Sequence, residues 1–264
     1  MDRGAAGGGR HDLRDRQEEG PLTSDGRFPA TRRSVVLAVR SGDPEERGWA
    51  LAVLVEQYWK PVYKYLRVRH RASDEDAQDL TQGFFARALD RDVLAGFEPA
   101  KGSFRTFLRV CLDRHAANER KAARRQKRGG GAPPLALDWR DAEGELRELA
   151  VTDGMTPDEY FHQEWVRSFF GVVVEALRAE LAAEGKAVYF TLFERYDLEC
   201  PPGPRPTYAE LAAELGVKAT DVTNHLASAR RRFRRLALAR LRELCAGDEE
   251  FEREAGDLLG GTAA

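Results

Sequence analysis

The sequence predicts an all-α protein, on three observations. Apolar residues recur at positions i, i+3, i+4 and i+7 along most of the chain, which is the spacing of one helix face, and strand signals are scarce. A length of 264 residues suits one or two domains with their own cores. The three cysteines lie far apart, so no disulfide or metal scaffold is expected. We therefore expect two small helical domains joined by a flexible linker.

The first domain is expected over residues 31–128 and holds three main helices. Asp43 and Pro44 supply a capping residue and a proline at the first helical position, so helix one begins there. Acidic residues from Asp74 onward open helix two, because negative charge is favourable at a helix N-terminus. A loop then leads to helix three, which begins near Phe104 and has arginines on the face opposite its apolar stripe.

The second domain is expected over residues 156–243. A run of glycines and prolines between Gly129 and Pro134 breaks the helical pattern before it and predicts a linker over residues 129–155. The segment Thr156-Pro157-Asp158-Glu159 is a capping box with proline at the first helical position, so a long helix starts there.

Residues 208–227 have the pattern of a helix-turn-helix. Thr207 and Glu210 form a second capping box, and Gly216 supplies the turn between the two helices. If Val222 and the apolar residues that follow it face the core, a step of about 100° per residue turns another set outward. That outward set is Thr220, Asn224, Ser228, Arg231 and Arg235. Asn can pair with adenine and Arg with guanine or phosphate, so these residues are candidate DNA contacts. The alternative is a solvated arginine face on a packing helix.

The two ends of the chain have compositions unlike the predicted domains. Residues 1–30 contain little apolar surface and are expected to form a disordered tail, and residues 244–264 an acidic C-terminal tail. No apolar run approaches the ~18 residues that a membrane span needs, and no signal segment opens the chain. A cytoplasmic protein with reduced thiols and no membrane association is expected.

Charge is segregated along the chain, although the formal net charge is only −2. Residues 101–128 hold 10 basic and 2 acidic residues, and residues 227–242 hold 7 basic and no acidic ones. Residues 137–164 hold 9 acidic and 2 basic residues. The low net charge excludes a globally basic DNA-coating protein, whereas the two basic helices could follow a nucleic-acid backbone. A solvated basic face is the alternative for each of them. The loop residue Phe97 is a further candidate, because an exposed aromatic ring can stack on an unpaired base.

An enzyme is not expected. The five histidines show no metal-ligand spacing, and glycine motifs that bind phosphates or dinucleotides are absent, so neither a cofactor nor a metal is predicted. His115 lies on the apolar stripe of helix three and is expected to be a core residue.

The order of these parts resembles a bacterial RNA polymerase sigma factor of the extracytoplasmic-function (ECF) group in the sigma-70 family. The segment Asp76-Ala77-Gln78-Asp79-Leu80-Thr81-Gln82-Gly83-Phe84-Phe85 is similar to the family motif that docks on the polymerase clamp. Residues 97–108 look like the loop and helix that read and melt the minus-ten element, and residues 208–232 resemble region 4, which binds the minus-thirty-five element. The resemblance covers roughly residues 32–243, and Phe28-Pro29-Ala30-Thr31-Arg32 is similar to an opening seen in a planctomycete and acidobacterial subgroup.

The resemblance implies a sigma factor that binds core RNA polymerase and directs promoter recognition and transcription initiation. The implied polymerase-binding residues are Asp76, Asp79, Gln82 and Phe85. The implied minus-ten contacts are Phe97, Lys101, Ser103, Arg105, Arg109, Arg120 and Arg124. The implied helix-turn-helix contacts are Lys218, Thr220, Asn224, His225, Ser228, Arg231, Arg232 and Arg235. Capture of an unpaired base by the loop before helix three would offset a few kcal/mol of unstacking.

The sequence departs from the common family pattern in both parts: in region 4 the family commonly places Lys or Arg around Thr223, His225 and Ser228, and three positions differ in region 2. Many ECF proteins have Asn and Asp where Arg114 and Asn118 stand, and Trp where Phe107 stands. An anti-sigma partner is a family expectation that no residue demonstrates. The second hypothesis is a stand-alone helix-turn-helix regulator that binds duplex DNA as a homodimer, which would leave the motif at residues 76–85 unexplained.

Overall fold

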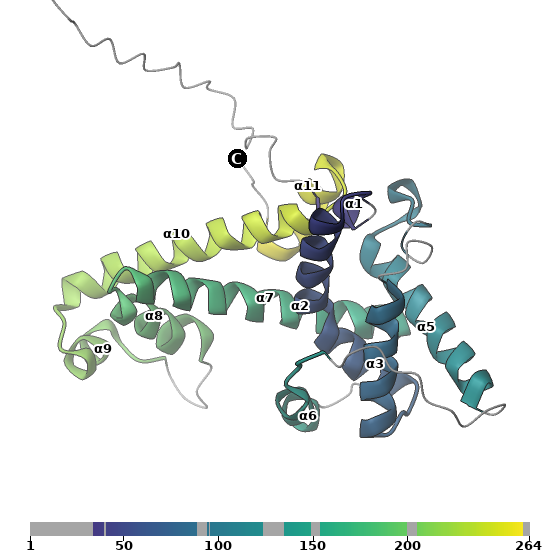
Figure 1. Ribbon diagram of the computed structural model, residues 1–264. Coiled ribbons are helices and arrows are strands. Elements are labelled where there is room, and N and C mark those ends of the chain that lie inside the picture. Colours follow the sequence, from purple (N-terminus) through teal and green to yellow (C-terminus); the bar gives the residue numbers. More distant parts are fainter. Residues whose placement is uncertain are drawn as a thin grey trace, which may run out of the picture. The chain divides into compact units, whose positions relative to one another are not determined.

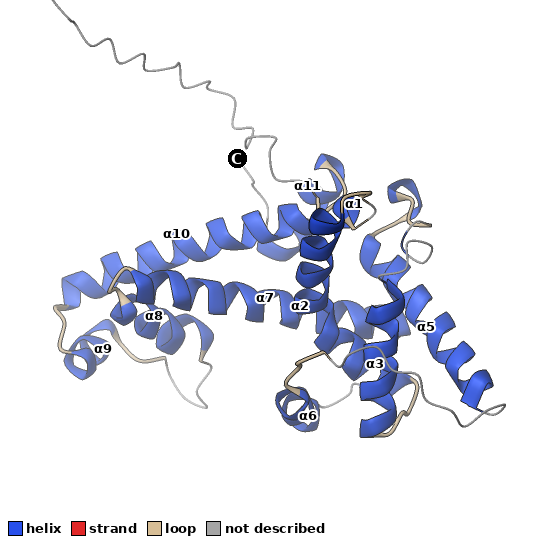
Figure 2. Cartoon of the chain, viewed as in Figure 1, coloured by secondary structure: helices blue, strands red, loops and turns tan. Residues whose placement is uncertain are grey.

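The described part of the chain is helical throughout. The computed structural model describes residues 34–39, 41–88, 94, 96–123, 135–148, 154–199 and 205–260, all within one compact unit spanning Arg32–Ala263. Its elements are α1 (Val35–Ala38), α2 (Pro44–Arg69), α3 (Asp74–Ala88), η1 (Pro99–Lys101), α5 (Phe104–Ala123), α6 (Trp139–Glu148), α7 (Pro157–Ala183), α8 (Ala187–Phe193), η2 (Glu194–Leu198), α9 (Tyr208–Leu215), α10 (Ala219–Leu244) and α11 (Asp248–Leu259). Figure 2 shows no strand in these ranges, which confirms the predicted all-α class.

Local sequence signals fix where the main helices begin. The Asp43 side chain accepts a hydrogen bond from the backbone N–H of Glu45, 3.0 Å away, and so caps α2 as predicted. Both predicted capping boxes are present, at the start of α7 and at the start of α9. None of the helices in the described ranges is long and apolar enough to span a bilayer.

The first apolar core joins the early helices to much later parts of the chain. It contains buried residues of α1, α2, α3 and α5 together with the first half of α7, the last part of α10, and α11. Tyr58 of α2 lies at the centre of this core, with its ring centroid 5.9 Å from that of Phe104 and 6.5 Å from that of Trp165. Figure 1 shows α7 crossing α2 and then running beside α10.

A buried ion pair crosses the contact between α2 and α7. The ammonium of Lys64 and a carboxylate oxygen of Glu164 are 3.1 Å apart, and both side chains are almost fully buried. Each charge has one more partner, because Lys64 also pairs with Glu145 of α6 and Glu164 with Arg167 of α7. Burying charges is costly unless they are paired in this way, so the pair fixes the register in which α2 and α7 meet.

The second apolar core lies at the far end of α7 and α10, where α8 and α9 pack against them (Figure 1). Leu177 and Leu181 of α7 and Leu226 of α10 are fully buried there. Gly216 ends α9 with a φ of 66°, a left-handed conformation that glycine adopts without steric cost. The helix-turn-helix predicted for residues 208–227 therefore forms, with its turn at the expected glycine.

Helix α6 lies inside the segment predicted to be a linker. Its acidic side chains bind the basic side of α2: Lys60 is 2.6 Å from both Asp141 and Glu145, and Arg67 is 2.6 Å from Glu143. The ring of Trp139 lies 5.6 Å from that of Trp59. Trp139, Ala142 and Leu146 stand at helical spacing, so the sequence carries a short signal for this helix, which the prediction of a linker overlooked. The ion pairs with α2 hold the helix in place.

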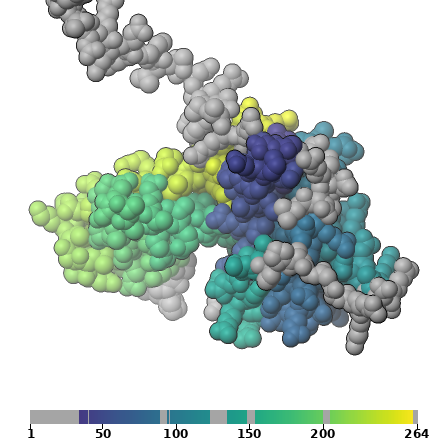
Figure 3. All heavy atoms as spheres, viewed as in Figure 1, coloured from purple at the N-terminus to yellow at the C-terminus, as the bar shows by residue number. Residues whose placement is uncertain are grey.

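Helix α11 lies inside the segment predicted to be an acidic tail. Phe251 and Ala255 of α11 are buried in the first core, and Figure 3 shows yellow C-terminal residues against the purple N-terminal helices. Contacts between α1 and α10 agree with this view. The division into residues 31–128 and 156–243 stays a prediction, since α7 and α10 each contribute to both cores.

The pairing of α2 with α7 can be tested by a double-mutant cycle. We expect Lys64→Met and Glu164→Gln to be coupled by about 1–3 kcal/mol in urea unfolding, because the two side chains share one buried contact. As a control, Lys64→Met combined with Gln163→Ala, an exposed neighbour on α7, should be additive within about 0.5 kcal/mol. Additive effects in the first pair would contradict the packing of α2 on α7.

Candidate nucleic-acid interface

The N-terminal end of α5 carries the first two arginines of the candidate minus-ten surface. Ser103 stands just before the helix, and its hydroxyl accepts a hydrogen bond from the backbone N–H of Thr106, 3.3 Å away, and contacts the Thr106 hydroxyl at 3.2 Å. Ser103 thus stabilises the start of the helix. Arg105 and Arg109 follow one turn apart, so they lie on the same side of α5.

Arg105 is held by the C-terminal helix. Its guanidinium donates to both carboxylate oxygens of Glu254 in α11, at 2.7 and 3.0 Å. The guanidinium carbon also lies 4.4 Å from the ring centroid of Trp165. A two-pronged contact with a carboxylate and a cation–π contact together fix the orientation of this side chain.

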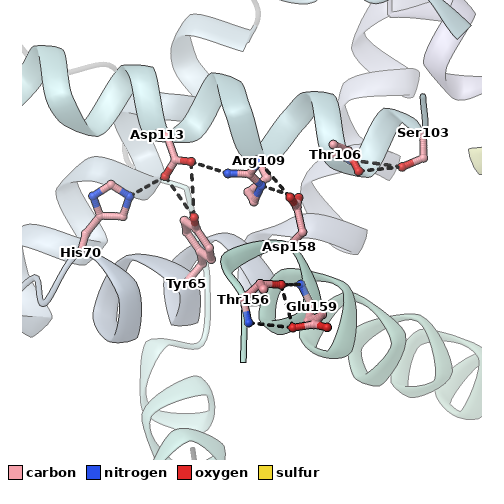
Figure 4. Close-up of polar contacts among 9 residues, drawn as sticks. All are labelled: Tyr65, His70, Ser103, Thr106, Arg109, Asp113, Thr156, Asp158 and Glu159. Atoms are coloured by element: carbon pink, nitrogen blue, oxygen red, sulfur yellow. Dashed lines mark hydrogen bonds and ion pairs between the residues drawn. The ribbon is translucent and has the colours of Figure 1, made fainter. Parts of the chain in front are cut away.

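Arg109 belongs to a polar network that joins α5, α2 and α7, drawn in Figure 4. It donates to Asp113 at 2.6 Å and to both oxygens of Asp158 at 2.6 and 3.2 Å. Asp113 also accepts from the hydroxyl of Tyr65 at 3.1 Å and lies 2.8 Å from Nε2 of His70. Arg109 therefore ties α5 to the first turn of α7.

Opposing effects set the ionisation of Asp113. Burial disfavours its carboxylate, but hydrogen bonds from His70 and Tyr65 and the charge of Arg109 outweigh burial, so the pKa of Asp113 is lowered. Burial, partly offset by a hydrogen bond with Arg109, raises the pKa of Tyr65 to about 12, so the phenol stays protonated and donates. The carboxylate is thus the acceptor at the centre of the network at neutral pH.

The remaining residues predicted for the minus-ten surface are spread out. Lys101 is exposed and pairs with Glu98 at 2.6 Å. Arg120 is exposed and donates to the backbone carbonyl of His70. Arg124 lies outside the described residues.

Phe97 was predicted to contact an unpaired base, but its side chain is buried. Its ring is 3% exposed and lies 5.2 Å from the ring of Phe104 and 5.4 Å from that of Phe107. The loop folds the ring inward because an apolar contact with two aromatic neighbours is available there. In this structure Phe97 supports the loop from inside and does not face a base.

A cavity beside this loop contains residues that the sequence did not single out as a site. It has a volume of about 370 Å³, and its walls are Phe84, Arg87, Gly96, Phe107, Cys111, Arg114, His115 and Asn118. His115 is 7% exposed, and its ring nitrogens make no well-formed hydrogen bond with a described residue. Burial and then the charge of Arg87 lower its pKa, so the ring is neutral at pH 7. The cavity offers aromatic walls, one neutral imidazole ring and two arginines.

The candidate polymerase-binding residues divide between the surface and the core. Asp76 and Asp79 of α3 are exposed, and Gln82 is half-buried. Phe85 is 2% exposed and packs edge-on against Phe84, with centroids 5.5 Å apart. Phe85 therefore shapes the core beneath α3, which corrects its prediction as a surface contact.

The residues predicted to contact DNA from the helix-turn-helix also divide between exposed and packed positions. Lys218, Thr220, Asn224 and Arg231 are exposed and Ser228 is half-buried, as the predicted outward set requires. The ring of His225 stacks on Tyr189 of α8, with centroids 3.9 Å apart, so it packs within the domain.

Two arginines at the next turn of α10 pair with α7. Arg232 lies 2.7 Å from Glu180 and 2.6 Å from Glu184, and Arg235 pairs with Glu180 as well. Hydrogen bonds from Arg232 and Lys186 lower the pKa of Glu184 to about 2. Arg231, between them, forms no ion pair within the described part of the chain. The sequence could not reveal these partners, because they come from helices about 50 residues away.

Removing the Asp113 carboxylate should weaken the network. We expect Asp113→Asn to lower the free energy of unfolding at pH 7 by roughly 1–2 kcal/mol, a modest value because the side chain is 34% exposed. The folded-state pKa is lowered, so the ionised carboxylate stabilises the fold above its ordinary pKa of 3.8, and that stability is lost as pH falls through the folded value. Urea unfolding should show a difference between wild type and variant that shrinks below about pH 4. Equal stabilities at pH 7 would contradict the network.

Comparison with known proteins identifies one segment of the fold. Residues 54–127 match the family model of sigma-70 region 2, from the middle of α2 to just beyond α5. No curated protein and no solved structure matched the chain. Within the described residues no group of His, Cys, Asp and Glu could hold a metal ion. The chain therefore contains a sigma-70 region 2 domain, and this match supports a relation to the sigma factors of the sigma-70 family.

Proposed function

We propose that this protein binds core RNA polymerase and directs it to promoters as a sigma factor of the ECF group. The observation that carries the proposal is the sigma-70 region 2 match over residues 54–127, which includes α3 and α5. The helix-turn-helix of α9 and α10, which lies outside that match, supplies a second candidate DNA-binding surface. A factor with two such surfaces contacts two promoter elements while the polymerase sets their spacing.

The polymerase contact is assigned to the exposed side of α3. Asp76 and Asp79 are exposed, and neither forms an ion pair within the described ranges. Carboxylates without internal partners are available to a cationic surface, and such complementarity guides and orients docking. Because Phe85 is buried, it acts here by holding α3 in place.

Promoter melting is assigned to the cavity between α3 and α5. An extruded base needs stacking partners and hydrogen-bonding groups, and capturing it offsets a few kcal/mol of unstacking. Phe107 offers an aromatic wall, the neutral ring of His115 lines the cavity, and Arg114 places a charged donor at the rim. Lys101 and Arg120, also exposed, would follow the phosphates.

Contact with the minus-thirty-five element is assigned to the start of α10. Thr220, Asn224 and Arg231 share an exposed face of this helix, and Lys218 is exposed just before its first residue. Asn and Arg recognise base edges, and Lys binds phosphate. An anti-sigma partner, the planctomycete and acidobacterial subgroup and a cytoplasmic location are further parts of this proposal.

The proposal is tested by binding to sigma-free core RNA polymerase. The purified chain should co-elute with the core enzyme on size exclusion, and a known sigma factor added in excess should displace it. Binding to duplex DNA without any binding to the core enzyme would instead favour a stand-alone helix-turn-helix regulator.

Reversing one charge on α3 should weaken polymerase binding. We expect Asp79→Lys to raise the dissociation constant for core polymerase at least ~10-fold, since a like charge at an interface costs more than 1.4 kcal/mol. Glu252→Lys is the control, because Glu252 is an exposed carboxylate of α11 and lies outside α3. Equal effects of the two substitutions in a competition titration would argue against the α3 interface.

Removing the rim charge of the cavity should impair DNA opening. With Arg114→Ala, we expect the permanganate reactivity of promoter thymines to fall ~10-fold or more while core binding is unchanged, because an extruded base loses a stabilising contact. Lys121→Ala, at an exposed position further along α5, serves as the control and should retain more than half of the reactivity. Undiminished opening in Arg114→Ala would remove this cavity from the mechanism.

A further inference from the structure

Helix α11 brings a carboxylate into the candidate DNA surface of α5. Glu254 is 4% exposed and accepts both hydrogen bonds that the Arg105 guanidinium directs toward it. A guanidinium binds a phosphate through the same pair of donors that it uses for a carboxylate. Arg105 therefore cannot hold Glu254 and a DNA phosphate in the same way at the same time.

The attachment of α11 suits a part that can move away. It follows α10 after only Cys245, Ala246 and Gly247, so it stays tethered wherever it goes. Its buried apolar residues are Phe251 and Ala255, and Leu258 and Leu259 pack half-buried against the first core. The guanidinium of Arg242 lies 5.2 Å from the Phe251 ring. The Glu254 pair joins α11 to α5 directly, and the ion pair of Asp248 joins it to Arg242 of α10.

The surroundings of Arg105 are acidic on the solvent side. A groove of about 270 Å³ borders Arg105, and its walls include Asp158, Glu159 and Asp257. Asp248, Glu249 and Glu252 add to the exposed acidic surface of α11. The carboxylates of α11 add to those of α7 and repel DNA from the end of α5, and their part is lost when α11 moves away.

We propose that α11 is an intramolecular competitor of DNA, in which Glu254 occupies Arg105 in the free chain and must leave before α5 binds a phosphate backbone. This inference rests on the proposed function, since it requires that α5 face DNA. Displacement would coincide with DNA binding, so the free chain would bind DNA weakly.

The test compares two single substitutions of equal charge on α11 in the full-length chain. Glu254→Gln removes the partner of Arg105, whereas Glu252→Gln changes an exposed residue with no ion pair among the described residues. The probe is a fluorescein-labelled single-stranded 20-nucleotide DNA of random sequence, followed by anisotropy at low salt. We expect Glu254→Gln to bind at least ~5-fold more tightly than Glu252→Gln, and adding Arg105→Ala should abolish that gain.

A second measurement is independent of how the variants fold. Hydrogen–deuterium exchange of the wild-type chain should accelerate in residues 248–259 when the same DNA is added, because α11 is released. Equal affinities of the two variants, or unchanged exchange in α11, would overturn the competitor role while leaving the proposed function intact. If neither wild type nor any variant bound DNA, the competitor role would also be overturned. The proposed function is tested separately, by co-elution with core polymerase.

Discussion

The structure depends on two long helices that each enter both apolar cores. Helix α7 begins beside Tyr58 and Phe104 in the first core and ends in the second core with α8 and α9. Helix α10 begins in the second core and returns to the first. The buried pair of Lys64 and Glu164 fixes where α7 crosses α2. The region 2 helices and the helix-turn-helix are thereby joined through continuous helical segments in the described structure.

Electrostatics explains how a chain of net charge −2 can carry basic helices. Most of the arginines on the candidate surfaces have a carboxylate partner within the fold: Arg105 pairs with Glu254, Arg109 with Asp113 and Asp158, and Arg232 with Glu180 and Glu184. A DNA phosphate has to compete with these carboxylates, so the affinity of the chain for DNA depends on which ion pairs break. Asn224 and Arg231 of α10 face no such competition within the described residues.

Helix positions were predictable where a local signal specifies them. The caps at Asp43, Thr156 and Thr207 and the turn at Gly216 are encoded within a few residues, and each was found where expected. Helix α6 and helix α11 carry apolar residues at helical spacing, but each is short, and the predictions assigned these segments to a linker and a tail. Their ion pairs with α2 and α5 join segments distant in sequence, which no local pattern reveals. The predictions likewise gave Phe97 and Phe85 binding roles, whereas packing against other aromatic rings buries them.

Transcription in vitro tests the central claim, that the region 2 domain makes this chain a sigma factor. Sigma-free core RNA polymerase should be combined with the chain and promoter fragments from its own genome, and the 5′ ends of the transcripts mapped. The account predicts discrete start sites that appear only with the chain present and share two upstream sequence elements. Transcripts that begin at random positions, or the same transcripts with and without the chain, would contradict it.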